Sequence, residues 1–145
     1  MTFDPTDDDL RLLRRAVELA HEARAAGQAP FGSLLAGPDG AILAEDHNTV
    51  LADGDITAHP ELKLARWAAR HLDRETAART TLYTSCQPCG MCTGALARSG
   101  LGRVVYALSN EQFFAENPGG GFPEVPQLGP GLPEEGRAAV AGYRP

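Results

Sequence analysis

Residues 81–108 read TLYTSCQPCGMCTGALARSGLGRVVYAL and contain three elements in a row. The β-branched and aromatic residues at 81–84 predict a strand, the small residues at 89–99 predict a helix, and residues 103–108 predict a second strand. A strand, a helix and a strand in this order form a crossover connection, which makes the two strands parallel. The segment therefore predicts an α/β fold.

The chain before this segment predicts a helix, a hairpin and another helix. Residues 6–26 carry apolar side chains at three- and four-residue spacing, with acidic residues in the first turn and Gly27 at the end. The apolar runs 31–36 and 41–44 are joined by the turn sequence GPDG, which favours a hairpin. Residues 59–72 predict a helix with Pro60 at its first position. This order of elements predicts a sheet between layers of helices.

The sequence signals for helices and strands become weaker after residue 108. We expect a short helix through Phe113 and Phe114, then a loop rich in glycine and proline at 117–133, and a final short helix at 133–141. The sequence shows neither an internal repeat nor a second domain. Because 145 residues is close to the common size of one domain, residues 1–145 are expected to form a single domain.

The charge and the hydrophobic composition of the chain indicate which kinds of partner to expect. The formal net charge is -6 and the sequence pI is near 5.1, so there is no broad basic surface for phosphate groups. We therefore expect a small-molecule substrate and no nucleic acid partner. The chain has no apolar run of about 18 residues, and its N-terminus is acidic rather than basic and apolar. A cytoplasmic protein without membrane association is expected.

Four residues predict a catalytic zinc site. The three cysteines stand too close together to make a disulfide framework across the fold, and in a reducing compartment such a cluster favours metal. His59, Cys89 and Cys92 supply three ligands that Zn²⁺ accepts, which leaves the fourth tetrahedral position open for water. Glu61 would remain free to take a proton from that water. We expect one Zn²⁺ per chain.

A structural zinc site is the alternative, and it stays open. If Cys86 were the fourth ligand, the coordination would be closed and no position would remain for water. The strand is expected to end at Cys86, and the turn at Gln87 and Pro88 should carry that thiol away from the helix. Cys86 is therefore expected to be a small buried side chain near the site.

The runs HPE at 59–61 and PCGMC at 88–92 resemble the signature of the cytidine-deaminase-like zinc deaminases. Residues 82–96, LYTSCQPCGMCTGAL, are most similar to the branch that holds guanine deaminases, fungal-type cytosine deaminases and tRNA adenosine deaminases. The resemblance extends from the first helix to about residue 108. It implies a three-layer α/β/α sandwich around a mixed sheet of about five strands. It also implies that His59, Cys89 and Cys92 bind zinc and that Glu61 shuttles protons.

Four further residues, with Tyr143 as an alternative, are candidates for substrate binding. By the resemblance, Asn48 stands where this branch hydrogen-bonds the substrate base, and Phe31 begins the strand that lines the pocket. Phe113 and Phe114, or Tyr143, would close over the base and stack on it. Two alternatives stay open: Asn48 as an ordinary turn residue, and the aromatic residues as core beneath a C-terminal helix.

The sequence thus predicts a hydrolase that releases ammonia from a free nucleobase or nucleoside of the guanine or cytosine type. Deamination of adenosine in tRNA is the runner-up, although residues 109–114 differ from the stretch found in tRNA-editing members. A catalytically silent zinc-stabilised module is a third hypothesis. Gln87 departs from the glutamate of many relatives at that position, and the resemblance further implies a homodimer.

Overall fold

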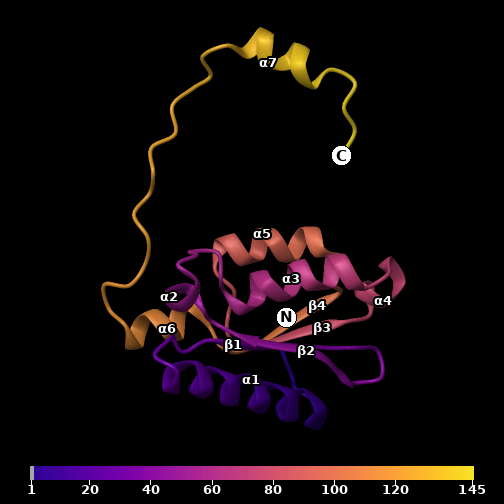
Figure 1. Cartoon of the computed structure of the whole chain (residues 1–145), viewed down its shortest axis with the longest axis vertical. Helices are drawn as coiled ribbons and strands as arrows, with labels where there is room; N and C mark the ends of the chain where they lie inside the picture. Colours follow the sequence, from indigo (N-terminus) through magenta and orange to yellow (C-terminus); the bar gives the residue numbers. More distant parts are fainter. Residues whose placement is uncertain (1) are drawn as a thin grey trace.

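The computed structural model describes residues 2–145 as eleven helices and strands in chain order (Figure 1). The elements are α1 Asp7–Ala25, β1 Gly32–Ala36, β2 Ile42–His47, α2 Val50–Asp53, α3 Pro60–His71, α4 Arg74–Ala78, β3 Thr81–Cys86, α5 Gly90–Ser99, β4 Arg103–Leu108, α6 Asn110–Glu116 and α7 Pro133–Val140. Every helix and strand expected from the sequence is present, with ends that differ by a few residues. The two very short helices α2 and α4 were not expected.

The sheet is mixed and has the strand order β2-β1-β3-β4. β1 pairs antiparallel with both β2 and β3, whereas β3 and β4 are parallel, as the crossover through α5 requires. The sheet has four strands, one fewer than the approximate number expected. The chain after β4 enters α6 and then the glycine- and proline-rich segment, and the described residues beyond Leu108 add no strand.

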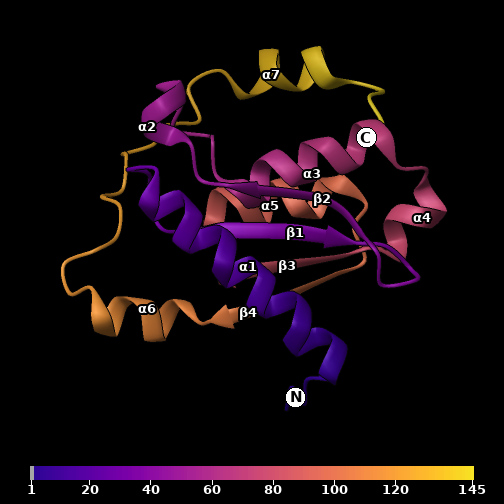
Figure 2. The same cartoon turned by 60° about the horizontal axis from the view of Figure 1, so that its bottom comes forward.

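Helices cover both faces of the sheet, which gives the expected three layers. α1 packs on one face against β1 and β3, and α3 and α5 pack side by side on the other (Figures 1 and 2). The start of α1 is set by a capping box in which the Thr6 and Asp9 side chains bond each other's backbone N–H groups.

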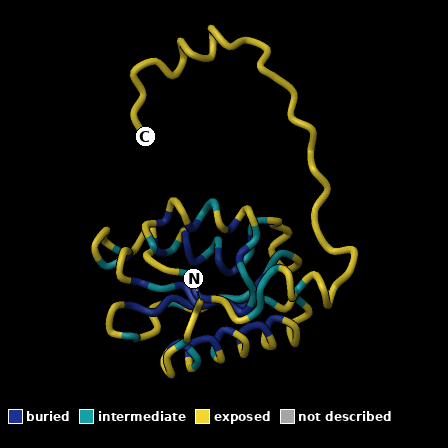
Figure 3. The backbone as a smooth tube through the Cα atoms, turned by 180° about the vertical axis from the view of Figure 1, so that it is seen from behind, coloured by how far each residue is buried: buried dark blue, intermediate teal, exposed yellow. Residues whose placement is uncertain are grey.

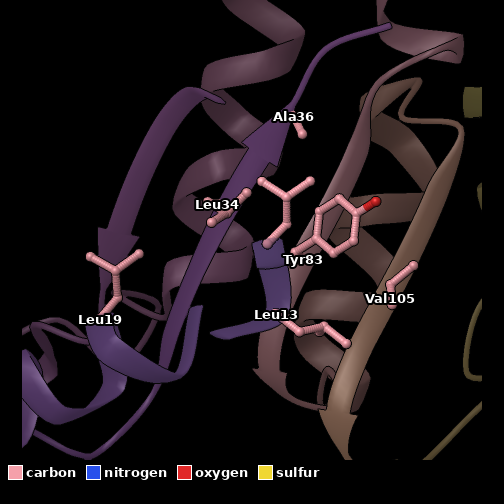
Figure 4. Close-up of a cluster of buried hydrophobic side chains, with 7 residues drawn as sticks. Leu13, Leu19, Leu34, Ala36, Tyr83 and Val105 are labelled. Atoms are coloured by element: carbon pink, nitrogen blue, oxygen red, sulfur yellow. The ribbon is translucent and has the colours of Figure 1, made fainter. Parts of the chain in front are cut away.

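Each layer boundary has its own apolar core. Between α1 and the sheet, Leu34, Tyr83 and Val105 are neighbours across β1, β3 and β4 and pack against Leu13 and Leu19 of α1 (Figure 4). The opposite core is formed by α3, α5 and the other face of the same strands, and comprises Leu35, Leu64, Ala65, Ala68, Leu82 and Leu96. The central strands β1 and β3 are therefore buried on both faces (Figure 3).

The C-terminal segment lies apart from these layers. Every residue from Phe114 to Pro145 is exposed, and the chain beyond α6 arcs away from the sheet and carries α7 at its far end (Figures 1 and 3). Among the described residues, no helix combines the length and apolar character needed to cross a membrane.

Candidate metal centre and active site

Two helix N-termini bring three metal ligands together. His59 is the N-cap of α3 and Cys89 the N-cap of α5, and neither side chain is used to cap its own helix. Cys92 lies in the first turn of α5. The His59 Nδ1 atom is 3.7 Å from the Cys89 Sγ and 3.5 Å from the Cys92 Sγ. Tetrahedral zinc with usual Zn–N and Zn–S bond lengths would place such nitrogen and sulfur atoms about 3.6 Å apart.

The donor set therefore fits zinc. The ligand atoms of His59, Cys89 and Cys92 all lie within 4.8 Å of one another. Burial raises the pKa of the Cys92 thiol, and the charge of Glu61 raises it further. A divalent cation among the three ligands opposes both effects, because it stabilises thiolates.

Cys86 lies outside this group of ligands. Among the residues that the structure describes, the metal-ligand cluster at this place contains only the histidine and the other two cysteines. Cys86 is half-buried at the end of β3 and lines the neighbouring cavity rather than being a fully buried side chain. The three-ligand arrangement leaves the fourth tetrahedral position of a zinc ion free.

Glu61 lies next to the ligands and accepts a hydrogen bond from one buried hydroxyl group, which is itself bonded by a second. Its side chain is 5% exposed, and its Oε2 atom is 3.6 Å from the Cys92 Sγ. The Thr84 hydroxyl donates to Glu61 Oε1 at 2.9 Å, and the Ser33 hydroxyl donates to Thr84 at 2.8 Å. Ser33 and Thr84 are register partners on β1 and β3, so the sheet orients the carboxylate.

A cavity of about 290 Å³ opens beside Glu61. Two metal ligands, Asn48 and several phenylalanines reach it from different elements. Its lining residues are Phe31, Asn48, His59, Pro60, Glu61, Cys86, Gln87, Cys89, Asn110, Phe113, Phe114, Gly120, Gly121 and Phe122.

The aromatic side chains of this cavity contact one another. The Phe31 and Phe113 rings meet edge to face with their centroids 5.7 Å apart, and Phe113 meets Phe114 in the same way at 5.4 Å. Apolar ring edges and faces therefore surround the space next to Glu61, as expected of a site for a flat ring.

The Asn48 amide has a defined direction. The side chain is 3% exposed, and its Oδ1 atom accepts a hydrogen bond from the Val50 backbone N–H at 3.0 Å. The Asn48 N–H in turn donates to the Phe31 carbonyl at 3.0 Å. The amide NH₂ group of Asn48 is therefore left to donate to a ligand in the cavity.

The family description "Cytidine and deoxycytidylate deaminase zinc-binding region" matches residues 6–108, which is most of the chain and includes all three metal ligands and Glu61. The chain belongs to this deaminase family. Its metal centre is accordingly a zinc centre, with His59, Cys89 and Cys92 in position to hold the ion.

Three of the relatives are deaminases named for different substrates. The chain is 37% identical over 106 residues to a probable cytosine deaminase of Schizosaccharomyces pombe, a match that covers 73% of this chain and 64% of the relative. It is 34% identical over 102 residues to a tRNA-specific adenosine deaminase of Haemophilus influenzae, covering 70% and 59%. Guanine deaminase of Bacillus subtilis is 44% identical over 96 residues, covering 66% and 61%.

The chain thus matches about six tenths of the length of these curated relatives. The structural similarity covers more of the chain than these sequence matches do. The crystal structure of the Bacillus subtilis guanine deaminase superposes with a TM-score of 0.67 and 30% identity, and the match covers 93% of this chain and 94% of that one.

The structure brings together all the candidate site residues predicted from the sequence except Tyr143. His59, Glu61, Cys89, Asn48, Phe31, Phe113 and Phe114 line one cavity, and Cys92 is buried beside it. Tyr143 does not take part, since it lies 69% exposed in the C-terminal segment. The hydroxyl pair Ser33 and Thr84 was missed, although polar residues inside two apolar strands were a visible signal.

Proposed function

We propose that this chain is a zinc-dependent hydrolase that deaminates a free nucleobase or nucleoside carrying a guanine- or cytosine-type amino group. The observation that carries the proposal is the cavity in which two of the metal ligands, Glu61 and Asn48 line the same space among aromatic rings. The net reaction replaces an exocyclic amine by oxygen: water supplies the oxygen, the bond between the ring carbon and the exocyclic nitrogen breaks, and ammonia leaves.

Glu61 is the residue that would move protons in this reaction. Zinc, when bound, supplies a water of lowered pKa. The carboxylate stands beside the ligand set and is oriented by Thr84, so it can accept a proton from water and deliver it to a ring nitrogen. The second proton of the same water goes, again through Glu61, to the departing amine, so that the ring nitrogen and the ammonia each gain one proton.

The neighbouring side chains would orient the ring. The free NH₂ group of Asn48 can donate to a carbonyl oxygen or an unprotonated ring nitrogen of the substrate. Phe113, which already contacts Phe31 and Phe114, offers a ring for stacking, an interaction of about 1–3 kcal/mol per base in single-strand binders. These contacts select a flat heterocycle with a polar edge.

The lining of the cavity favours a free base over a base within a nucleic acid. None of the fourteen lining residues is an arginine or a lysine, so no cation at the cavity wall would meet a phosphate backbone. The volume of about 290 Å³ is at the small end of ligand cavities, which suits one ring system. Guanine is the first candidate, because the likeness to guanine deaminase covers nearly the whole chain.

Adenosine in tRNA is the second candidate, supported by the 34% identity to a tRNA-specific adenosine deaminase. Such an enzyme must flip the base out of the RNA and bind phosphates, so its affinity falls with salt. Salt-sensitive tRNA binding together with inosine formation would support this substrate. Absence of binding at low salt would exclude it.

The experiment that tests the proposal is an ammonia-release screen with the zinc-loaded protein. Guanine, cytosine, adenine, their nucleosides and amino-triazines are offered in parallel, with tRNA as a separate arm. Release from guanine or cytosine or one of their nucleosides supports the proposal. Release from tRNA adenosine alone would replace the substrate, and release from none of the compounds would contradict the enzymatic function.

We also propose that residues 1–145 act as one domain and that the chain forms a homodimer. Leu51 and Ile56 lie in the segment between Asn48 and His59 and are 73% and 80% exposed, so two large apolar side chains near the site are open to a partner. Light scattering coupled to size exclusion should give twice the chain mass of 15.4 kDa. A mass of one chain at micromolar concentration would contradict the dimer.

A further inference from the structure

Lys63 is the only lysine in the sequence. The other Lys+Arg positions are all arginines. It lies in α3, two residues after Glu61 and four after His59. Its side chain is 21% exposed, and its ammonium group faces the end of β2 and the start of the loop after it. This segment, residues 46–49, is called the Asn48 strap below.

The ammonium group of Lys63 makes three hydrogen bonds to the strap. Its Nζ atom donates to Asp46 Oδ1 at 2.8 Å, to the His47 carbonyl at 2.9 Å and to the Thr49 hydroxyl at 2.9 Å. These acceptors lie on both sides of Asn48 in the chain. An ammonium group has three N–H donors, so the strap uses all of them.

The remaining hydrogen bonds of the strap do not join it to α3. The Asn48 N–H is bound to the Phe31 carbonyl, and the Thr49 N–H is bound to the Ala58 carbonyl in the loop before the helix. Lys63 therefore provides the polar link between the strap and the helix that carries Glu61 and is capped by His59.

We propose that Lys63 is a positioning residue that sets the place of the Asn48 amide relative to Glu61 and the metal ligands. The inference rests on the proposed function, because it takes Asn48 as the group that reads the substrate. Lys63 itself does not line the cavity and touches no reacting atom. Its effect would be on how well the substrate is held at the metal.

The geometry also predicts that arginine cannot replace this lysine. Three acceptors converge on a single nitrogen atom, which a tetrahedral ammonium satisfies. A guanidinium is planar and spreads its donors over three nitrogens, so it cannot reproduce this arrangement. Charge alone is therefore not enough at position 63.

The test compares Lys63→Met and Lys63→Arg with Arg70→Met, a matched control that removes an exposed charge from the same helix. Ammonia release, zinc content and melting temperature are measured for each. In both Lys63 variants we expect zinc to be retained and KM to rise about tenfold, since freeing hydrogen-bonded groups of this kind typically costs that factor. The kcat should change much less, and the control should match the wild type.

A double-mutant cycle separates positioning from general stability. If Lys63 acts through Asn48, adding Lys63→Met to Asn48→Ala should not raise KM further. Full additivity of the two effects, or a wild-type KM in Lys63→Met, would overturn the proposal. Should Lys63→Met fail to fold, Thr49→Val removes one of the three acceptors and should show a smaller rise in KM with the same non-additivity.

A second readout does not depend on turnover. Amide exchange of Asn48 and Val50 reports on the strap, because their N–H groups bond the Phe31 carbonyl and the Asn48 side chain. We expect faster exchange there in Lys63→Met and unchanged exchange in Arg70→Met. Unchanged exchange in both would refute the positioning role. If the wild type releases no ammonia from any base, the proposed function fails. The exchange measurement still tests whether Lys63 positions the strap.

Discussion

Thr84 and Ser33 determine how the Glu61 carboxylate is held. One hydroxyl donates to the carboxylate and the other donates to the first hydroxyl, and both are fully buried. A carboxylate that exchanges protons must keep its direction while its charge changes, and a neutral hydroxyl provides this without adding a competing charge. The pair therefore fixes the direction of the Glu61 carboxylate, which suits its proposed role as proton acceptor.

Thr84→Val tests this support, since valine keeps the shape and removes the hydroxyl. We expect kcat to fall about tenfold, the usual effect of losing one hydrogen bond to a charged group, while zinc content stays at one per chain. Thr81→Val at the other end of β3 is the control. Wild-type kcat in Thr84→Val would show that the hydroxyl pair does not orient Glu61.

Cys86→Ser separates a three-ligand site from a closed four-ligand site. Because Cys86 lies outside the ligand cluster, the variant should bind one zinc per chain and keep its turnover. Elemental analysis of the purified protein, together with ammonia release, gives both quantities. Loss of the metal in Cys86→Ser would instead indicate a structural zinc site without an open position.

At the scale of single residues, the spacing of the zinc ligands and Glu61 in the sequence allowed the site to be predicted. Contacts between residues far apart in the sequence could not be predicted. The ligands and Glu61 fall in two short runs whose spacing alone predicts zinc chemistry. Ser33 and Thr84 meet only because β1 and β3 pair in one register, and Lys63 meets the Asn48 strap only because α3 packs beside β2. Such contacts depend on tertiary structure, so they cannot be predicted from the sequence of each segment taken separately.

At the scale of elements, the contact between α1 and β1 depends on the absence of a side chain at Gly32. A Cβ atom built there would lie 2.5 Å from the Leu19 Cβ and from the Ala20 backbone nitrogen, and 2.6 Å from the Ala16 carbonyl oxygen. No ordinary contact is that short, so the helix or the strand would have to move.

Gly32→Ala should therefore lower the free energy of unfolding by about 3 kcal/mol, the upper part of the usual range for overpacked cores. Gly136→Ala is the control, because a Cβ atom there meets nothing within 4 Å. Urea denaturation of both variants measures the effect. Equal stability of Gly32→Ala and the wild type would contradict the close packing of α1 on β1.

A second set of contacts joins α1 to β3 and β4. The Tyr83 hydroxyl donates to Asp9 at 2.6 Å, and the Arg103 guanidinium donates to the same carboxylate at 3.0 Å. Burial acts to raise the pKa of Asp9, but the hydrogen bonds from Tyr83 and Thr6 and the charge of Arg103 outweigh it and lower that pKa.

This pKa has a consequence for stability. A carboxylate whose pKa is lower in the folded state contributes stability above its unfolded pKa, and loses it as the pH falls through the folded value. We expect Asp9→Asn to cost about 1–3 kcal/mol at neutral pH, with a difference from the wild type that shrinks below about pH 4. Unfolding measured from pH 3 to 7 checks this, and a difference independent of pH would contradict it.

The elements themselves were largely predictable because their signals are local. A capped amphipathic helix, a GPDG turn between apolar runs and a strand-helix-strand unit each have a direct sequence signature. α2 and α4 are only four and five residues long, too short for a helical period to appear. The expected fifth strand came from resemblance rather than from any pattern beyond residue 108.

At the scale of the whole molecule, the cavity is formed partly by the α/β/α layers and partly by the chain after β4. The sheet, α3 and α5 hold the zinc ligands, Glu61 and Asn48, whereas α6 and residues Gly120 to Phe122 supply one side of the cavity. Glu61, Asn48 and Cys92 are buried, whereas Phe114 and Phe122 at the cavity wall are exposed. This division explains why the reaction class is clearer from sequence than the substrate.

The most direct test of the account compares zinc-loaded wild type with Glu61→Gln. Both proteins should contain one zinc per chain, because Glu61 is not a ligand. The wild type should release ammonia from a free base such as guanine or cytosine, and Glu61→Gln should do so at least about 100-fold more slowly, as expected on loss of a general acid-base group. Undiminished release by Glu61→Gln, or no release by the wild type from any base, would contradict the central claim.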